Sequence, residues 1–343
     1  MIILDACRPD YLGCYNPNFS NNSKHIDQIA LEGKVFKKVK SPGSATSESL
    51  PRIFSGNRYH PLVGFTFPSK KKWVKRSILA VKSLWEVPAF CLKLPAILLG
   101  KFFLKLRMRF FDTKISFLKK SFVENIRKEL ITCCVGANPY LDFGFKKGFD
   151  EFYNLISVKM EEGLMDFRLK DFLHPKIVTE KAIDFIERTR RNYFLYIHFL
   201  QPHAPYLERD GKLIKPHKLS YWEMKFRINS EKKILSKILN RIEKAYCNNI
   251  RIVDREVYRI FTKALENSED LLFIVTSDHG EIIREYPKYK IFQHYPCFHA
   301  PELIRVPLVI WSSLPVSKIV RKIRNLVKIP KVIKRFLKVC KRK

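Results

Sequence analysis

Residues 271–281 read LLFIVTSDHGE. The first six residues form a short apolar run that is rich in β-branched and aromatic side chains, and such a run predicts a buried strand. Asp278 and His279 follow directly, so they stand at the carboxyl end of that strand. In parallel α/β sheets this is the edge at which ligands bind. The segment therefore predicts a buried strand of an α/β sheet, and it predicts that the ligand-binding residues lie at the carboxyl end of this strand.

Two further apolar segments end in polar residues of the same kind. Residues 1–4 run directly into Asp5, and the apolar run over residues 193–200 is followed by His203. Because the carboxyl ends of parallel strands meet at one edge of a sheet, we expect these side chains to lie close to the Asp-His pair of the first segment. Carboxylates and imidazoles gathered in this way make a divalent-metal site.

Helical patterns separate the strand-like segments. The sequence predicts helices over residues 178–190 and about 231–266, ahead of the strands at 193–200 and 271–276. Strands that alternate with helices favour an α/β fold, in which a mostly parallel sheet carries helices on both faces. A chain of 343 residues that is 46% hydrophobic has enough apolar surface for such a core, and this composition excludes global disorder.

The chain is strongly basic, with 65 Lys and Arg against 33 Asp and Glu and a net charge of +32. Residues 70–120 hold fourteen cations and two acids, and residues 315–343 hold twelve cations and no acid. Each segment therefore contributes a net +12. So large an excess implies an anionic partner, and its concentration in two segments needs its own explanation.

Both basic segments interleave cations with apolar and aromatic residues at helical spacing. This pattern is typical of helices that lie on an anionic membrane surface, where each cation contributes ~1 kcal/mol. We therefore expect such a surface to bind through residues 70–120 and 315–343. One alternative is that basic helices pack on the domain with their charges in solvent. Nucleic acid is the least favoured partner, because no nucleic-acid-binding motif is present.

Residues 44–49 read SATSES and supply hydroxyl groups at an expected helix start. A hydroxyl bound to a metal loses its proton easily and becomes a nucleophile. A helix N-terminus beside it offers N–H groups to an oxyanion. Each element alone has an ordinary interpretation: Asp5 can cap a helix, His203 can be a core histidine, and Thr46 can be an N-cap. Their occurrence together and in this order favours an active site.

Four segments together resemble one known family. Residues 5–15 (DACRPDYLGCY) look like the opening metal motif of sulfatases and their relatives in the alkaline phosphatase superfamily. Residues 198–206 (HFLQPHAPY) resemble the strand-end histidine motif of the family, and residues 277–281 (SDHGE) are similar to its second metal motif. Residues 302–311 resemble the segment that follows the catalytic core. Ordered motifs are a far more specific signal than any single match.

The resemblance covers roughly residues 1–60 and 121–312. It implies an alkaline-phosphatase-like α/β fold, with a mostly parallel sheet and helices on both faces, in a catalytic domain of residues 1–312. A basic amphipathic helical insert, residues 66–120, interrupts this domain. A basic amphipathic tail, residues 313–343, follows it.

The sequence departs from sulfatases at the nucleophile. Sulfatases usually carry a Cys or Ser that matures to formylglycine within a Cys/Ser-x-Pro-x-Arg motif, whereas residues 46–50 here read TSESL. A Thr in this setting looks more like the phosphoethanolamine and phosphoglycerol transferases, which use a metal-bound Thr as nucleophile. By this likeness Thr46 is both nucleophile and metal ligand, with Ser47 as the fallback.

The resemblance also implies roles for the other site residues. The expected metal ligands are Asp5, Thr46, Asp278 and His279, and the expected catalytic residues are Thr46, His203 and His294. The last two histidines would contact the oxyanion or the leaving group, or hold a second metal, and His299 is the alternative to His294. Arg8 and Asp10 are expected to form a supporting pair. Because imidazole is among the ligands, manganese or zinc is favoured, with calcium or magnesium as alternatives.

These features predict a metal-dependent, sulfatase-like enzyme that hydrolyses or transfers a sulfate or phosphate ester, on a glycan or lipid-linked substrate at a membrane surface. The alternative is a catalytically inactive relative that binds an anionic membrane or glycan. The eight cysteines contain no CxxC pair, and no signal peptide or membrane-spanning stretch is visible. We therefore expect a cytoplasmic protein with reduced thiols that attaches peripherally to the membrane.

Overall fold

A computed structural model describes most of the chain outside the basic insert. The described residues are 1–61, 64–66, 114–116, 118–156, 159–161, 164–166, 175–208, 213–214, 232–285, 294 and 299–342. The basic insert is expected to be helical over residues 66–120. Residues 67–113 lie outside this set, so their helices and their contact with a membrane stay predictions, whereas residues 114–116 form a short strand and not the expected helix.

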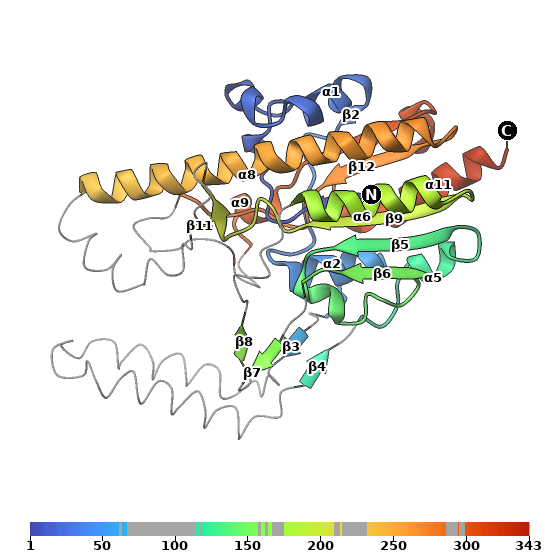
Figure 1. Cartoon of the computed structure of the whole chain (residues 1–343), viewed down its shortest axis with the longest axis horizontal. Coiled ribbons are helices and arrows are strands. Elements are labelled where there is room, and N and C mark those ends of the chain that lie inside the picture. The colour runs from blue at the N-terminus through green and yellow to red at the C-terminus, as the bar shows by residue number, and fades with distance from the viewer. Residues whose placement is uncertain are drawn as a thin grey trace.

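The core of the fold is a seven-stranded sheet with the strand order β2-β13-β12-β1-β9-β5-β6 (Figure 1). Its strands are β1 (Ile2–Leu4), β2 (Lys34–Val35), β5 (Ile131–Gly136), β6 (Glu151–Asn154), β9 (Tyr193–Phe199), β12 (Leu272–Thr276) and β13 (Leu308–Ser312). The five strands from β12 to β6 are parallel, and β13 pairs antiparallel with both of its neighbours. The mostly parallel sheet predicted from the sequence is confirmed.

The helices and smaller elements surround this sheet. The longer helices are α1 (Lys24–Glu32), α2 (Thr46–Ser55), α6 (Pro175–Arg188), α8 (Lys232–Glu266) and α11 (Ile329–Cys340). The short helices are α5 (Val123–Ile126), α9 (Pro301–Ile304) and α10 (Val316–Ile319), with 3-10 turns η1 (Pro9–Tyr11), η2 (Pro17–Asn22), η3 (Pro139–Asp142) and η7 (Leu326–Lys328). Two-stranded ribbons pair β3 (Gly64–Thr66) with β4 (Lys114–Ser116), β7 (Lys159–Glu161) with β8 (Leu164–Asp166), and β10 (Tyr206–Leu207) with β11 (Leu213–Ile214).

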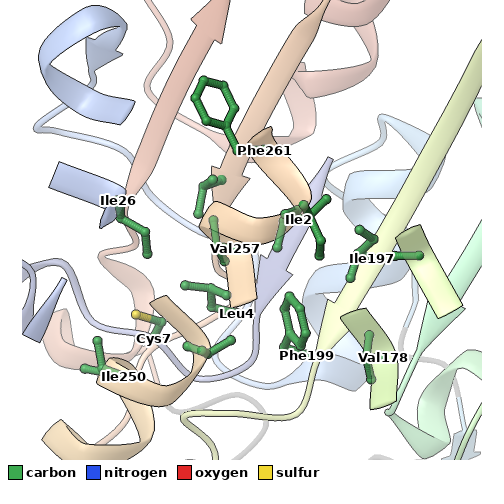
Figure 2. Packing of buried hydrophobic residues seen from close by; sticks show 14 of the residues in the cluster. Ile2, Leu4, Cys7, Ile26, Val178, Ile197, Phe199, Ile250, Val257 and Phe261 are labelled. Carbon is green, nitrogen blue, oxygen red and sulfur yellow. The ribbon is translucent and has the colours of Figure 1, made fainter. Parts of the chain in front are cut away.

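Alternate residues of the strands face two separate hydrophobic clusters. Ile2 and Leu4 of β1 belong to the first cluster, together with residues of α1, α6 and α8, whereas Ile3 belongs to the second, together with residues of α2 and α11. Figure 2 shows the first cluster, where Val178 of α6 and Val257 of α8 pack over the strands. Because successive side chains of a strand project to opposite faces, helices cover both faces of the sheet, as predicted.

The strand order places the predicted catalytic segments next to one another. Strands β12, β1 and β9 are adjacent and parallel, so that Ile3 lies between Thr276 of β12 and His198 of β9. Their carboxyl ends therefore meet at one edge of the sheet. Asp5 leaves β1 and Asp278 follows β12 at this edge, which is the convergence that the sequence predicted.

The C-terminal tail contributes to the second cluster. Its apolar side chains are buried there, among them Ile319 of α10 and Ile333 and Phe336 of α11. The apolar side chains of the described tail therefore pack on the domain, which is the alternative given for the basic segments, and do not face a membrane as those of an interfacial helix would. The lysines and arginines of residues 315–342 are exposed, and their contact with an anionic surface stays a prediction. Within the described ranges, no helix combines the length and the apolar content needed to cross a bilayer.

The packing of the tail predicts how two neighbouring substitutions differ. Ile333 is 5% exposed within the second cluster, so Ile333→Ala should lower the free energy of unfolding by roughly 2–5 kcal/mol through lost burial and a residual cavity. The adjacent Lys334 is exposed, so Lys334→Ala should change it by less than about 0.5 kcal/mol. Urea unfolding measures both values. Equal, small effects would show that α11 does not stabilise the fold.

Candidate metal centre and active site

Asp5 occupies the first position after β1 and is almost fully buried. Its Oδ2 accepts a hydrogen bond from Asn138 Nδ2 at 2.6 Å and lies 3.3 Å from His198 Nε2. Its Oδ1 has no hydrogen-bond partner among the described residues. Ala6, the next residue, has a φ of 60°, a left-handed conformation that is uncommon for a residue with a side chain. This turn directs the Ala6 N–H to Asp278 Oδ1, at 3.4 Å.

Asp278 and His279 follow β12 and are fully buried. Asp278 Oδ1 accepts a hydrogen bond from the backbone N–H of His279 at 3.0 Å, and Asp278 Oδ2 has no hydrogen-bond partner among the described residues. His279 Nδ1 lies 2.8 Å from the carbonyl oxygen of Gly280, and since a carbonyl only accepts, Nδ1 carries the hydrogen. The other ring nitrogen, His279 Nε2, lies 3.4 Å from Asp5 Oδ1 and 3.6 Å from Asp278 Oδ2.

These three residues fit a divalent cation. One ligand atom from each of Asp5, Asp278 and His279 lies within 4.8 Å of the other two. Two buried carboxylate oxygens without hydrogen bonds are costly unless a cation compensates them. Carboxylate oxygens combined with an imidazole nitrogen suit zinc or manganese better than calcium, which prefers oxygen ligands alone. The carboxylates and the imidazole would therefore hold the ion.

Thr46 places a hydroxyl at this cluster. It is the first residue of α2, it is 3% exposed, and its Oγ1 lies 3.2 Å from His279 Nε2. Three of the four predicted metal ligands thus form the cluster itself, and the hydroxyl of the fourth is adjacent to it. Ser47, the fallback nucleophile, is the next residue of the helix and is also buried.

The loop before α2 is tightly held, which defines the position of Thr46. Glu48 reaches back along the chain and accepts hydrogen bonds from the N–H and the hydroxyl of Ser44, at 2.9 and 3.0 Å. Gly43 packs against it so closely that an added Cβ would lie 2.3 Å from the Glu48 Cβ. Arg52 Nη1 donates to the carbonyl of Pro42 at 2.5 Å. Hydrogen bonds between residues of α2 and the loop before it therefore fix the first turn of the helix against that loop.

The predicted histidines gather on one side of the cluster. The His294 ring lies 4.1 Å from that of His279 and 4.9 Å from that of His203, measured between ring centres. His294 Nδ1 is 3.1 Å from Glu281 Oε1. His299, the alternative to His294, is 53% exposed, and its Nε2 lies 3.7 Å from a Glu48 oxygen. The structure thus brings His203 and His294 to the centre, and their catalytic roles stay predictions.

The predicted supporting pair is also formed. Arg8 Nη2 lies 2.6 Å from Asp10 Oδ2, and Arg8 Nη1 bonds to the carbonyl of Glu281 at 3.1 Å and to Glu285 Oε1 at 2.5 Å. A Cβ on Gly280 would lie 3.2 Å from the Arg8 side chain and 1.9 Å from the carbonyl oxygen of Glu302. Arg8 therefore fastens the loop that carries Asp278 and His279 to the loop that carries Asp5.

The sulfatase family model matches residues 120–338, which is more than half of the chain. The chain belongs to the sulfatase family. It is an enzyme of the alkaline phosphatase superfamily, and sulfatases are generally metal-dependent. A search of curated protein sequences finds no match.

Solved structures share the fold of this sulfatase-family chain. The soluble domain of lipooligosaccharide phosphoethanolamine transferase A from Neisseria meningitidis has a TM-score of 0.61 at 13% identity, over 98% of this chain and 86% of that one. The C-terminal periplasmic domain of EptC from Escherichia coli, solved with zinc, gives 0.57 at 12% identity, over 96% and 78%. A putative sulfatase from Bacteroides thetaiotaomicron gives 0.54 at 12% identity, over 90% and 63%. These similarities confirm the alkaline-phosphatase-like fold that the motifs predicted.

Four residues of the candidate centre have no role in the sequence analysis. Asn138 and His198 contact Asp5, Tyr196 lies 2.8 Å from His198 Nδ1 through its hydroxyl, and Glu281 contacts His294. Asn138 could have been found, because it follows β5 as Asp5 follows β1. His198 and Glu281 lie inside segments that resemble family motifs, and Tyr196 lies in the strand just before one of them, but only the side-chain contacts show what these three residues hold.

The electrostatics of the cluster reflect two buried acids around one imidazole. Burial acts to lower the pKa of His279, but the carboxylates of Asp278 and Asp5 outweigh it and raise this pKa to about 10. Burial acts to raise the pKa of Asp5, yet His203, His198 and His279 hold it well below its usual range. Without a cation, a proton on His279 thus compensates part of the negative charge.

Removing one carboxylate should remove the metal. Asp278→Asn keeps the size of the side chain but removes its charge, so we expect affinity for zinc or manganese to fall more than ~10-fold. Asp10→Asn is the matched control, because Asp10 is 52% exposed and pairs with Arg8 outside the cluster. Metal content after dialysis, measured by atomic spectroscopy, compares the two variants. Equal metal retention would exclude Asp278 as a ligand.

Metal binding should release a proton. His279 binds a cation only as the neutral imidazole, whereas its pKa of about 10 keeps it protonated at pH 7. The apparent metal affinity should therefore rise with pH, by up to about tenfold per pH unit, until the pH passes that pKa. Calorimetry in buffers of different ionisation enthalpy counts the protons, and we expect close to one per ion at pH 7. An affinity that does not change with pH would contradict this coupling.

Proposed function

We propose that this sulfatase-family enzyme hydrolyses or transfers a phosphate or sulfate ester by way of a covalent intermediate on Thr46. The position of Thr46 carries the proposal: its hydroxyl lies 3.2 Å from His279, at the N-terminus of a helix and beside two buried carboxylate oxygens without hydrogen bonds. A bound divalent cation would acidify the threonine hydroxyl and neutralise the charge of the ester oxygens. Asp5, Asp278 and His279 would hold it, with zinc or manganese favoured.

The chain's own groups then divide the reaction into two displacements. In the first, Thr46 Oγ1 loses its proton and forms a bond to phosphorus or sulfur, the bond to the ester oxygen breaks, and the departing oxygen takes up a proton, so that an alcohol leaves. In the second, water or another hydroxyl attacks the same atom and loses its proton, the bond to Thr46 Oγ1 breaks, and Thr46 takes up a proton and recovers its hydroxyl. Water gives a hydrolase and a sugar or lipid hydroxyl gives a transferase. The first turn of α2 presents N–H groups to the anionic group in both steps.

His294 is suited to move a proton in the second step. Its Nδ1 contacts Glu281, which leaves Nε2 as the nitrogen that can act on a substrate. Burial, followed by the charge of the neighbouring His279, lowers the pKa of His294, so the ring is neutral near pH 7. A neutral imidazole accepts the proton of the incoming hydroxyl. His203 lies beside it, where it can contact the oxyanion or the leaving group.

The proposed substrate is a glycan or a lipid-linked ester at an anionic membrane surface. The threonine nucleophile favours a phosphate ester, and the similar neisserial enzyme is a lipooligosaccharide phosphoethanolamine transferase. The exposed cations of residues 315–342 supply a surface for peripheral attachment. The similar EptC domain is periplasmic, so a cytoplasmic location for this chain stays a prediction.

Substitution of Thr46 tests the nucleophile. Thr46→Ala should lower turnover at least ~1,000-fold, because no oxygen remains at that position, whereas Thr46→Ser should keep part of the activity. Ser47→Ala, one residue along the same helix, should stay within about fivefold of the unchanged enzyme. Aryl phosphate, aryl phosphodiester and aryl sulfate, each assayed with zinc and with manganese, give the rates and the preferred ester.

The pattern of losses identifies the nucleophile. If Ser47→Ala is inactive and Thr46→Ala is active, the nucleophile is Ser47. If both variants turn over every ester at the original rate, neither residue forms the intermediate.

A further inference from the structure

A basic hollow lies between α10 and α11, on the C-terminal tail. Its volume is about 470 Å³, which is within the usual range for small-ligand sites, ~300–1,000 Å³. Five of its seven lining residues are cations, namely Lys318, Arg321, Arg335, Lys338 and Arg342. A serine and a valine complete the lining, and no acid takes part. We call this feature the basic hollow.

Among the described residues, carboxylates neutralise some of the exposed cations of the protein, but not those of the basic hollow. Arg284 pairs with Glu243 at 2.6 Å, and Lys341, the residue after α11, pairs with Glu129 at 2.8 Å. By contrast, none of the five cations of the hollow has a carboxylate within ion-pair distance in the part of the chain that the structure describes. The hollow therefore concentrates positive charge that the fold itself does not neutralise.

Packing holds these cations together against their mutual repulsion. The opposite sides of α10 and α11 are buried, with Ile319 and Val320 on one segment and Val332, Ile333 and Phe336 on the other. The backbone that carries the five cations is therefore anchored in the second hydrophobic cluster. Like charges gathered in a concave site raise the local positive potential, and an anion bound there relieves it.

The basic hollow lies at the edge of the sheet opposite to the catalytic centre. Ser312, the last residue of β13, pairs with Leu272, the first residue of β12, so α10 begins near the amino ends of the parallel strands. At the other side of the hollow, Lys341 pairs with Glu129, two residues before β5 begins at Ile131. In Figure 1 the C-terminus lies at the end of the sheet from which β5 starts. The hollow is thus separate from the site of Asp5 and Thr46.

We propose that the basic hollow is a second anion site, which binds a group that carries two or more phosphate or sulfate charges. The planar forks of Arg321, Arg335 and Arg342 match the paired oxygens of such groups, and Lys318 and Lys338 add positive charge. Several cations around one hollow favour a multiply charged group over a single carboxylate. A lipid headgroup and a soluble sugar ester offer the same chemistry. This site is additional to the function proposed for Thr46.

Two double variants of α11 test the proposal. Arg335→Ala with Lys338→Ala removes two cations from the basic hollow, and Lys331→Ala with Lys334→Ala removes two exposed cations of the same helix that do not line it. Calorimetry with sucrose octasulfate measures binding to the full chain. We expect the first variant to bind at least ~10-fold more weakly and the second within about twofold, because only the first loses charge-assisted hydrogen bonds. Both variants keep the catalytic residues, so any binding of sucrose octasulfate at the catalytic centre contributes equally to the two measurements.

Vesicles distinguish the two sources of the anionic group. Flotation with phosphatidylcholine vesicles, with and without phosphatidate, uses the same variants. If only the variant of the basic hollow loses phosphatidate-dependent binding to vesicles, the anionic group is a lipid headgroup. If that variant loses binding of sucrose octasulfate but not of vesicles, the group is a soluble ester. Arg321→Ala, outside α11, is a second test should the double variant fail to fold. Equal losses in the hollow and control variants, or no binding of either probe to the unchanged protein, would overturn the proposal.

Discussion

Two carboxylate oxygens, one on Asp5 and one on Asp278, lie inside the protein without a hydrogen bond from any described residue. Such a pair is unfavourable in a folded protein unless positive charge lies between its members. The structure supplies part of this charge through the imidazole of His279, whose raised pKa is the direct result. The residues around the two carboxylates either compensate their negative charge or use it to bind a cation. The rest of the site therefore depends on this buried pair.

The fold meets this constraint with local devices. Adjacent strands β12 and β1 bring the two acids together, and the left-handed turn at Ala6 directs a backbone N–H to Asp278. Arg8 fastens the two loops to each other, and the Glu48 carboxylate holds the start of α2. Membership of the sulfatase family and the fold shared with phosphoethanolamine transferases agree with a metal-dependent ester enzyme.

Residues that follow an apolar strand were predictable, because their position along the chain already tells which edge of the sheet they occupy. Asp5 and Asp278 are examples. Residues that act through a side-chain contact were not predictable. His198 sits within β9 and contacts Asp5 at the end of the neighbouring strand β1, and Glu281 contacts a histidine thirteen residues away. The tail shows the same limit, since its amphipathic pattern fits a membrane surface and a protein core equally well.

The sequence by itself determined the α/β class, the acids and histidines at the strand ends, and the threonine at a helix start, because hydrophobic periodicity and local order encode these features. Only the tertiary structure decided which strands are neighbours, which carboxylate oxygens remain without hydrogen bonds, and which side of the tail is buried. These depend on contacts between residues hundreds of positions apart, such as Asp5 with His279, and on competition among surfaces for the same apolar side chains. Neither the long-range contacts nor this competition can be predicted from a single segment of the chain.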